Sequence, residues 1–242
     1  MTEFISLGEN CLPDDVLSQH GLKKESYPFG GGRFNIEYIT QIIESDFRDL
    51  LNPEYLHKGM TEAKEVVRNS HYTFNHDIYS ETVTLGFEFT HHNVFEDAPR
   101  RSFSRKIERF REALKSGRKI VFFYHYRYSD KMDPETVKRL LNQFLDLIKK
   151  RFGYQYKCLL VYQTLSSTDK HIVTSRSNDI FVAEFFTLQE WEGDDLWNGS
   201  SDRDLFNQLF SSRELLSFAY GSFYFLEPIK STLRKIARRI LK

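Results

Sequence analysis

The second half of the 242-residue chain alternates between helical and uniformly apolar segments, and no other feature restricts the fold as strongly. Residues 101–116 and 134–151 carry apolar side chains at helical spacing, and Asp133-Pro134 is a typical start for the second helix. The uniformly apolar segments span residues 119–126, 156–162 and 180–185. Strands that are apolar on both faces are typical of parallel sheets covered by helices. We therefore predict a three-layer α/β fold with a mainly parallel sheet and helices on both faces.

The first half of the chain supplies further elements. Residues 4–7 form a short apolar run that ends at Gly8, as expected for a buried strand before a turn. Residues 34–51 have apolar side chains at helical spacing, and residues 71–90 are typical of β structure. Apolar side chains alternate strictly within residues 83–90, and we expect this strand to join the same sheet as the others.

Most of the chain is predicted to form one domain. No internal repeat, low-complexity segment or linker-like stretch interrupts residues 1–228, which we assign to a single α/β domain. Residues 229–242 predict a basic amphipathic helix, with one apolar stripe and with Lys and Arg but no acidic residue elsewhere. Such a helix can lie on an anionic membrane surface or pack its stripe on the domain, and the sequence leaves both open.

Charge and composition argue against several classes of function. The 34 basic and 34 acidic side chains balance, so no overall positive field favours a nucleic-acid partner. Two cysteines are too few for a disulfide framework, and the sequence has neither a signal-peptide pattern nor a long apolar segment. His71, His76 and Asp77 lack a recognised metal-ligand spacing. We expect a cytoplasmic protein, at most peripheral at the inner face of the membrane, with neither metal nor cofactor.

Cys11 is the first candidate for a reactive side chain. It follows the strand predicted at residues 4–7, and Pro13 with two acidic residues after it predicts the start of a helix. A helix N-terminus stabilises a thiolate, and ligands of open α/β sheets bind beyond the carboxyl ends of strands. A free cysteine can equally be a small buried residue; we keep this alternative for Cys11 and prefer it for Cys158.

Several segments resemble a known family. The run Ser6-Leu7-Gly8-x-x-Cys11 and the later run Ser26-Tyr27-Pro28-Phe29 are similar to the opening of the bacterial "putative papain-like cysteine peptidase" family, a domain of unknown function. A histidine shortly before residues 105–110 and the apolar strand after them match as well. The family usually continues with an acidic residue and Trp, where this chain has Gly30-Gly31-Gly32-Arg33. The resemblance implies a thiol enzyme and offers a papain-like α+β fold, with a mostly antiparallel sheet, as the alternative fold.

A thiol nucleophile needs a base, and often a third group that orients the base. His91 and His92 follow a predicted strand, and the order Cys before His agrees with papain-like enzymes. Strand alternation places His91 on the phenylalanine face, so we prefer His92 as the base of Cys11, with His91 as the second choice. The candidates to orient the imidazole are Asn93, Asp97 and a polar residue near Tyr124-His125, and Asn10 is a candidate donor to an oxyanion. Two histidines at a strand end can also be ordinary surface residues.

A basic segment raises the question of an anionic ligand. Residues 100–119 contain nine basic and two acidic side chains, which is typical of a solvated helix face. The functional interpretation is an anion site formed by Arg33, Arg105 and Arg109. The glycines before Arg33 could hold a phosphate with their amides, although a plain turn is the better interpretation because the spacing of nucleotide motifs is absent.

Three functions fit these observations. The first is a cysteine-dependent hydrolase or acyl transferase that uses Cys11 and a histidine. The second is a transferase in surface polysaccharide biosynthesis with an anionic or nucleotide-sugar donor. The third is a non-catalytic interaction domain. The substrate expected for the enzymes is a small molecule, a peptide or a glycan.

Overall fold

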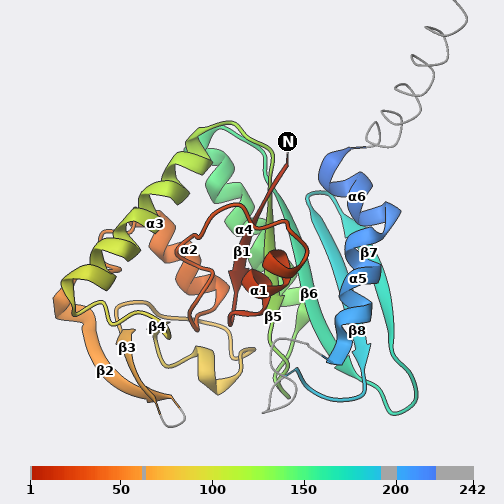
Figure 1. Cartoon of the computed structure of the whole chain (residues 1–242), viewed down its shortest axis with the longest axis horizontal. Helices are drawn as coiled ribbons and strands as arrows, with labels where there is room; N and C mark the ends of the chain where they lie inside the picture. Colours follow the sequence, from red (N-terminus) through yellow and green to blue (C-terminus); the bar gives the residue numbers. More distant parts are fainter. Residues whose placement is uncertain (1, 62–63, 192–200, 222–242) are drawn as a thin grey trace, which may run out of the picture.

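The computed structural model describes residues 2–61, 64–191 and 201–221, and these contain two separate β-sheets (Figure 1). The larger sheet has five strands in the order β1-β5-β6-β8-β7. Its strands are β1 (Glu3–Gly8), β5 (Ile120–Tyr126), β6 (Lys157–Leu165), β7 (His171–Ser177) and β8 (Ile180–Thr187). The pairs β1–β5, β5–β6 and β6–β8 are parallel, and only β7 pairs antiparallel, with β8. The α/β class is therefore confirmed, and the sheet is mixed but mostly parallel, unlike the mostly antiparallel sheet of the papain-like alternative.

The segments 101–116 and 134–151 are helical, as their apolar spacing predicts. The helices are α1 (Leu12–Gln19), α2 (Ile36–Glu44), α3 (Asp97–Lys115), α4 (Pro134–Phe152), α5 (Arg203–Ser211) and α6 (Arg213–Tyr220). The Asp133 side chain caps α4 by accepting a hydrogen bond from the backbone N–H of Thr136 at 3.1 Å. Gly153 ends α4 with a φ of 79°, a left-handed conformation that glycine adopts without steric cost. These two local signals determine where the helix that connects β5 to β6 begins and ends.

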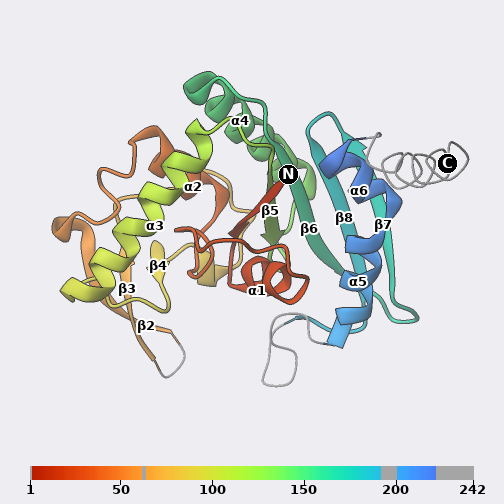
Figure 2. The same cartoon turned by 45° about the horizontal axis from the view of Figure 1, so that its top comes forward.

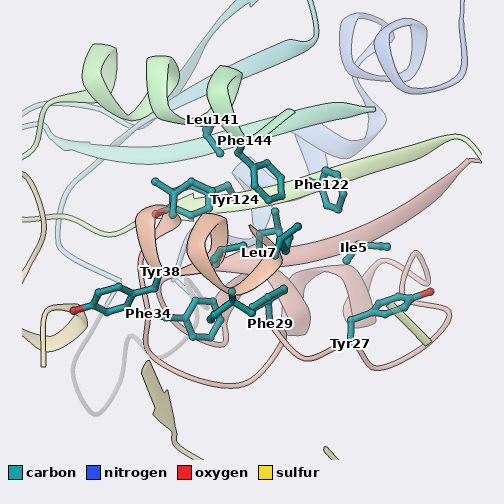
Figure 3. Packing of buried hydrophobic residues seen from close by; sticks show 14 of the residues in the cluster. Ile5, Leu7, Tyr27, Phe29, Phe34, Tyr38, Phe122, Tyr124, Leu141 and Phe144 are labelled. Carbon is teal, nitrogen blue, oxygen red and sulfur yellow. The ribbon is translucent and has the colours of Figure 1, made fainter. Parts of the chain in front are cut away.

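Two hydrophobic clusters use opposite sides of the same strands. Phe122 and Tyr124 of β5 belong to the first cluster, whereas Val121 and Phe123 belong to the second, as the twofold repeat of a strand requires. The first cluster contains side chains of α2, α3 and α4, and the second contains side chains of α1, α5 and α6. Figure 3 shows part of the first cluster, where β1, β5 and α4 contribute side chains to one apolar core.

The smaller sheet was predicted incorrectly from the sequence. It consists of three antiparallel strands, β2 (Leu56–Thr61), β3 (Lys64–Asn69) and β4 (Phe87–Phe89), and it lies apart from the larger sheet in both orientations (Figures 1 and 2). The strand predicted at 83–90 is shortened to β4 and does not join the larger sheet. Residues 81–83 form a 3-10 turn, and Gly86, with a φ of 103°, lies so close to Asn69 that an added Cβ would be 2.6 Å from the carbonyl oxygen, so the extended strand begins only at Phe87, where it pairs with β3.

Other boundaries also differ from the prediction. The helix predicted at 34–51 ends at Glu44, because Asp46 and Phe47 have positive φ values of 53° and 60°. The edge strand β7 was not predicted, since most of its side chains are exposed and its sequence lacks a continuous apolar run. The amphipathic helix predicted at 229–242 lies outside the described residues. Within the described part of the chain, no helix combines the length and apolar character needed to cross a membrane.

Candidate active site

Cys11 lies where the first strand meets the first helix. β1 runs parallel to β5 with Gly8 opposite His125, and Cys11 is the N-cap residue of α1. A Cβ on Gly8 would lie 2.6 Å from the Pro13 ring, so the tight turn between strand and helix requires glycine. This location agrees with the sequence-based expectation of a thiol at a strand-to-helix junction.

Asn10 anchors the turn that carries Cys11. Its side-chain Oδ1 accepts a hydrogen bond from the backbone N–H of Leu12 at 3.1 Å and lies 3.0 Å from His125 Nδ1. Asn10 and His125 are both buried, so these contacts are shielded from water. The turn is thereby held against the end of β5.

Glu9, two residues before Cys11, is a fully buried carboxyl group. The Tyr124 hydroxyl donates to its Oε1 at 2.6 Å, and the backbone N–H of Arg127 donates to its Oε2 at 3.1 Å. Burial is the main cause that raises the pKa of Glu9 to about 8, against the lowering effect of these contacts. Glu9 is therefore mostly protonated at neutral pH.

His91 is the imidazole that the fold brings to Cys11. Its Nε2 lies 3.2 Å from Cys11 Sγ, although 80 residues separate the two in the chain. His91 lies two residues after the end of β4, and β4 is held by Glu88, which accepts hydrogen bonds from Arg68 and from the hydroxyls of Thr61 and Thr90. One member of the Cys–His pair thus follows a strand of the larger sheet, and the other follows a strand of the smaller sheet.

The charge state of the pair follows from its surroundings. Burial, together with the nearby carboxylates of Asp15 and Asp14, raises the pKa of Cys11 to about 11. His91 is exposed on one side, and desolvation of the rest of the ring is the main cause that lowers its pKa, with Lys64 and Lys106 acting in the same direction. At neutral pH the pair is therefore a thiol beside a neutral imidazole, and not a thiolate–imidazolium pair.

His92 does not make the contact with Cys11 that strand alternation suggested. Its Nε2 lies 2.7 Å from Lys106 Nζ, and burial followed by Lys106 and His91 lowers the pKa of His92 to about 4. β4 ends at Phe89, and a turn follows in which the His92 N–H donates to the Phe89 carbonyl at 3.2 Å. Alternation cannot be extended beyond the last strand residue, so the geometric order of the two histidines is the reverse of the predicted one.

Asn93 lies in the turn before α3 and has local partners. Its Nδ2 donates to Glu96 Oε1 at 2.7 Å, and its Oδ1 accepts from the backbone N–H of Phe95 at 3.3 Å. Asn93 is exposed, and its described contacts place it in a capping turn and not against an imidazole. Among the described residues, no hydrogen bond joins Asn93 to an imidazole, as its predicted role as the orienting group would require.

The three arginines predicted to bind an anion lie outside the lining of the Cys11 pocket, although Arg33 is near enough for its charge to oppose burial, which raises the pKa of the thiol. Arg33 lies 3.9 Å from buried Glu88, and Arg109 pairs with Glu25 at 3.2 Å. Arg105 is exposed on α3. None of the three lines the pocket that contains Cys11. The basic side chains in the pocket wall are instead those of two lysines, Lys23 and Lys106.

Cys11 and His91 open onto a pocket of about 360 Å³. Its walls come from the first turn of α1, from the glycine segment, from the turn after β4 and from α3, and they include Asp15, Gly31 and Lys106. The sequence did not single out Asp15 or Lys106 as site residues, and for the glycine segment that includes Gly31 it favoured a plain turn over a phosphate site. Lys106 lies inside the family-like segment 105–110, which was the one signal that could have pointed to it. Among the described residues, no group of three or more potential ligands could hold a metal ion.

Comparisons with known proteins identify the family of the chain. The molecule is an α/β protein with a mostly parallel sheet, and its candidate site holds a thiol beside an imidazole. The model of the family described as "Putative papain-like cysteine peptidase" matches residues 2–165, and the chain therefore belongs to this family. Membership supports a cysteine-dependent hydrolase in general terms.

A comparison with individual proteins also finds a relative of the chain. The chain is similar to "Uncharacterized protein R408" of Acanthamoeba polyphaga mimivirus, with 28% identity over 160 residues that cover 61% of this chain and 72% of the viral protein. This relative is viral, so the bacterial source suggested by the resemblance remains a prediction. No solved structure matches the chain significantly.

Proposed function

We propose that the protein is a cysteine-dependent hydrolase or acyl transferase, with Cys11 as the nucleophile and His91 as the base. The observation that carries the proposal is the 3.2 Å separation of Cys11 Sγ and His91 Nε2 at the wall of a pocket. A nucleophile and a base within direct proton-transfer distance are the minimum requirement for covalent catalysis of this kind. The alternative of Cys11 as a purely structural residue leaves the adjacent imidazole without a role.

The neutral resting pair determines the first step. The thiol proton passes to Nε2 of His91 as the sulfur attacks the carbonyl carbon, and the C=O π electrons move to the oxygen. The resulting tetrahedral adduct then breaks its bond to the leaving group, which takes the proton from His91 and leaves a thioester. Water, or another acceptor in a transferase, attacks the thioester with His91 again as the base.

Nearby polar groups have proposed supporting roles. Asp15 lies close enough to His91 for its negative charge to raise the pKa of the imidazole, and it favours the imidazolium that forms during the reaction. Asn10, whose orientation is fixed through Oδ1, is the proposed donor to the oxyanion. Asp15 thus takes the supporting role that the sequence assigned to Asn93.

Acetylation by p-nitrophenyl acetate tests the proposal without knowledge of the natural substrate. We expect acetyl transfer to Cys11, detected by mass spectrometry of its peptide, at a rate above that of the unfolded protein. Cys11→Ser should abolish this thioester, and His91→Gln should slow its formation by about 100-fold or more, the usual contribution of a positioned base. The same experiment with Cys158→Ser is the matched control, because Cys158 is fully buried in β6.

Two results would contradict the proposal. One is acetylation of Cys11 no faster in the folded protein than in the unfolded protein. The other is a rate that does not respond to His91→Gln. Either result would leave the non-catalytic interaction domain as the better interpretation.

A further inference from the structure

Lys106 brings a half-buried ammonium group into the wall of the Cys11 pocket. It projects from α3, and its Nζ lies 2.7 Å from His92 Nε2 and 5.9 Å from the centre of the Phe103 ring. Burial is the main cause that lowers the pKa of Lys106, while Asp14 acts in the opposite direction. The ammonium is therefore partly removed from water at a defined position in the pocket.

The partner of Lys106 supplies a hydrogen bond but no negative charge. His92 is neutral at physiological pH, so its Nε2 can accept a hydrogen bond from the ammonium. Within residues 2–61, 64–191 and 201–221, no carboxylate forms an ion pair with Lys106. By contrast, Lys23 in the same pocket pairs with Asp14 at 2.6 Å.

A half-buried cation without a direct ion pair is suited to an anionic ligand. Burying a charge is costly unless an opposite charge accompanies it, so an anion that enters the pocket gains from pairing with Lys106. Asp14 and Asp15, also in the pocket, would repel such an anion, and Lys23 neutralises one of them. The Lys106 ammonium is therefore the favourable place for an anion in this pocket.

We propose that the pocket accepts an acyl substrate that carries a compact anion, a carboxylate or a phosphate, close to the carbon that Cys11 attacks. Lys106 binds the anion, and His92 holds the Lys106 ammonium in place. This inference rests on the proposed function and adds the class of substrate to it. It also assigns to Lys106 the anion-binding role that the sequence gave to Arg33, Arg105 and Arg109.

Alkylation by iodoacetate and iodoacetamide provides the test. The reagents have similar size and form the same bond with sulfur, but only iodoacetate places a carboxylate beside the reacting carbon. We divide the rate at which iodoacetate alkylates Cys11 by the rate for iodoacetamide, both measured by peptide mass spectrometry. This ratio is then divided by the same ratio for glutathione. Because both reagents meet the same thiol, this quotient is independent of the pKa of Cys11.

The expected quotient is well above one in the wild-type protein. Lys106→Gln should lower it roughly five- to tenfold, and Lys106→Arg, which keeps the charge, should restore most of it. Arg105→Gln is the matched control. It removes a positive charge from the residue before Lys106 in α3, and Arg105 does not line the pocket. It should change the quotient less than twofold. Protection of Cys11 from iodoacetamide by sodium phosphate or by sodium acetate, at equal ionic strength, distinguishes the two kinds of anion.

A wild-type quotient near one overturns the inference, and so does a quotient that Lys106→Gln leaves unchanged. If Lys106→Gln does not fold, the wild-type quotient and its decrease with added KCl still decide, since screening weakens attraction between charges. Failure of the proposed function is a separate result. It would appear as a rate of acetylation by p-nitrophenyl acetate, a neutral reagent, that does not depend on His91.

Discussion

Arg68 donates two hydrogen bonds to Glu88, from Nε at 3.0 Å and from Nη2 at 2.9 Å, across the β3–β4 pair. Glu88 is buried, and the Thr90 hydroxyl donates to its other oxygen at 3.0 Å. The strand that ends just before His91 is therefore fixed by a buried charged pair. Correct placement of the proposed base depends on this pair, although neither member reaches the pocket.

Arg68→Met should destabilise the protein and displace His91. Removing Arg68 leaves Arg33, 3.9 Å away, as the remaining charge partner of buried Glu88 among the described residues, and breaking a buried ion pair typically costs up to about 3–5 kcal/mol in the free energy of unfolding. Lys58→Met is the control, because Lys58 pairs with Glu65 on the surface of the same small sheet, where such pairs contribute about 0–1 kcal/mol. Urea denaturation measures the free energy of unfolding of both variants. Equal effects of the two substitutions would contradict the positioning role of Glu88.

The acid limb of the reaction should report the pKa of His91. Only the neutral imidazole can accept the thiol proton, and the pKa of His91 is lowered from 6.5 by burial and by Lys64 and Lys106. The rate of Cys11 acetylation should therefore rise with pH through a midpoint below 6.5. Lys106→Gln removes one of the lowering charges and should move the midpoint upward. A midpoint above 6.5 in the wild-type protein would conflict with the neutral resting pair.

Glu9 should make the protein less stable as the pH rises. Its pKa is raised from 4.5 to about 8 in the folded state, so between these values the folded chain holds a proton that the unfolded chain has lost. The free energy of unfolding should fall by up to about 1.4 kcal/mol per pH unit in this window and level off above it. Glu9→Gln, which resembles the protonated carboxyl group, should remove this slope. Urea denaturation at pH 5, 6.5 and 8 gives the measurement.

Two neighbouring glycines should respond differently to alanine. A Cβ on Gly30 would lie 2.6 Å from Asp14 Oδ1 and 2.9 Å from Ser6 Oγ, whereas the nearest atom to a Cβ on Gly31 is His91 Cδ2 at 3.6 Å. Gly30→Ala should therefore displace Asp14 and slow Cys11 acetylation, while Gly31→Ala meets only ordinary contact distances. Similar rates for both variants would show that the Ser6–Asp14 contact, 3.1 Å in length, does not shape the pocket.

The α/β class and the setting of Cys11 were accessible from the sequence. The segments from α3 through β6 are predictable because their signals are local: apolar spacing, the Asp133 cap and the glycine that ends α4. Cys11 likewise follows a buried strand and precedes a helix within ten residues of chain. Such elements depend on neighbours in sequence, and periodicity reports them directly.

The choice between the two histidines and the identity of the basic residue in the pocket depended on tertiary structure. Alternation predicts orientation only within a strand, and β4 ends at Phe89, two residues before His91. Likewise, helical spacing predicts that Lys106 lies between apolar positions of α3, but not that the turn after β4 packs against it. Both outcomes are decided by contacts between segments that are far apart in the chain, such as Cys11 with His91 and Lys106 with His92, and no local pattern encodes those distances.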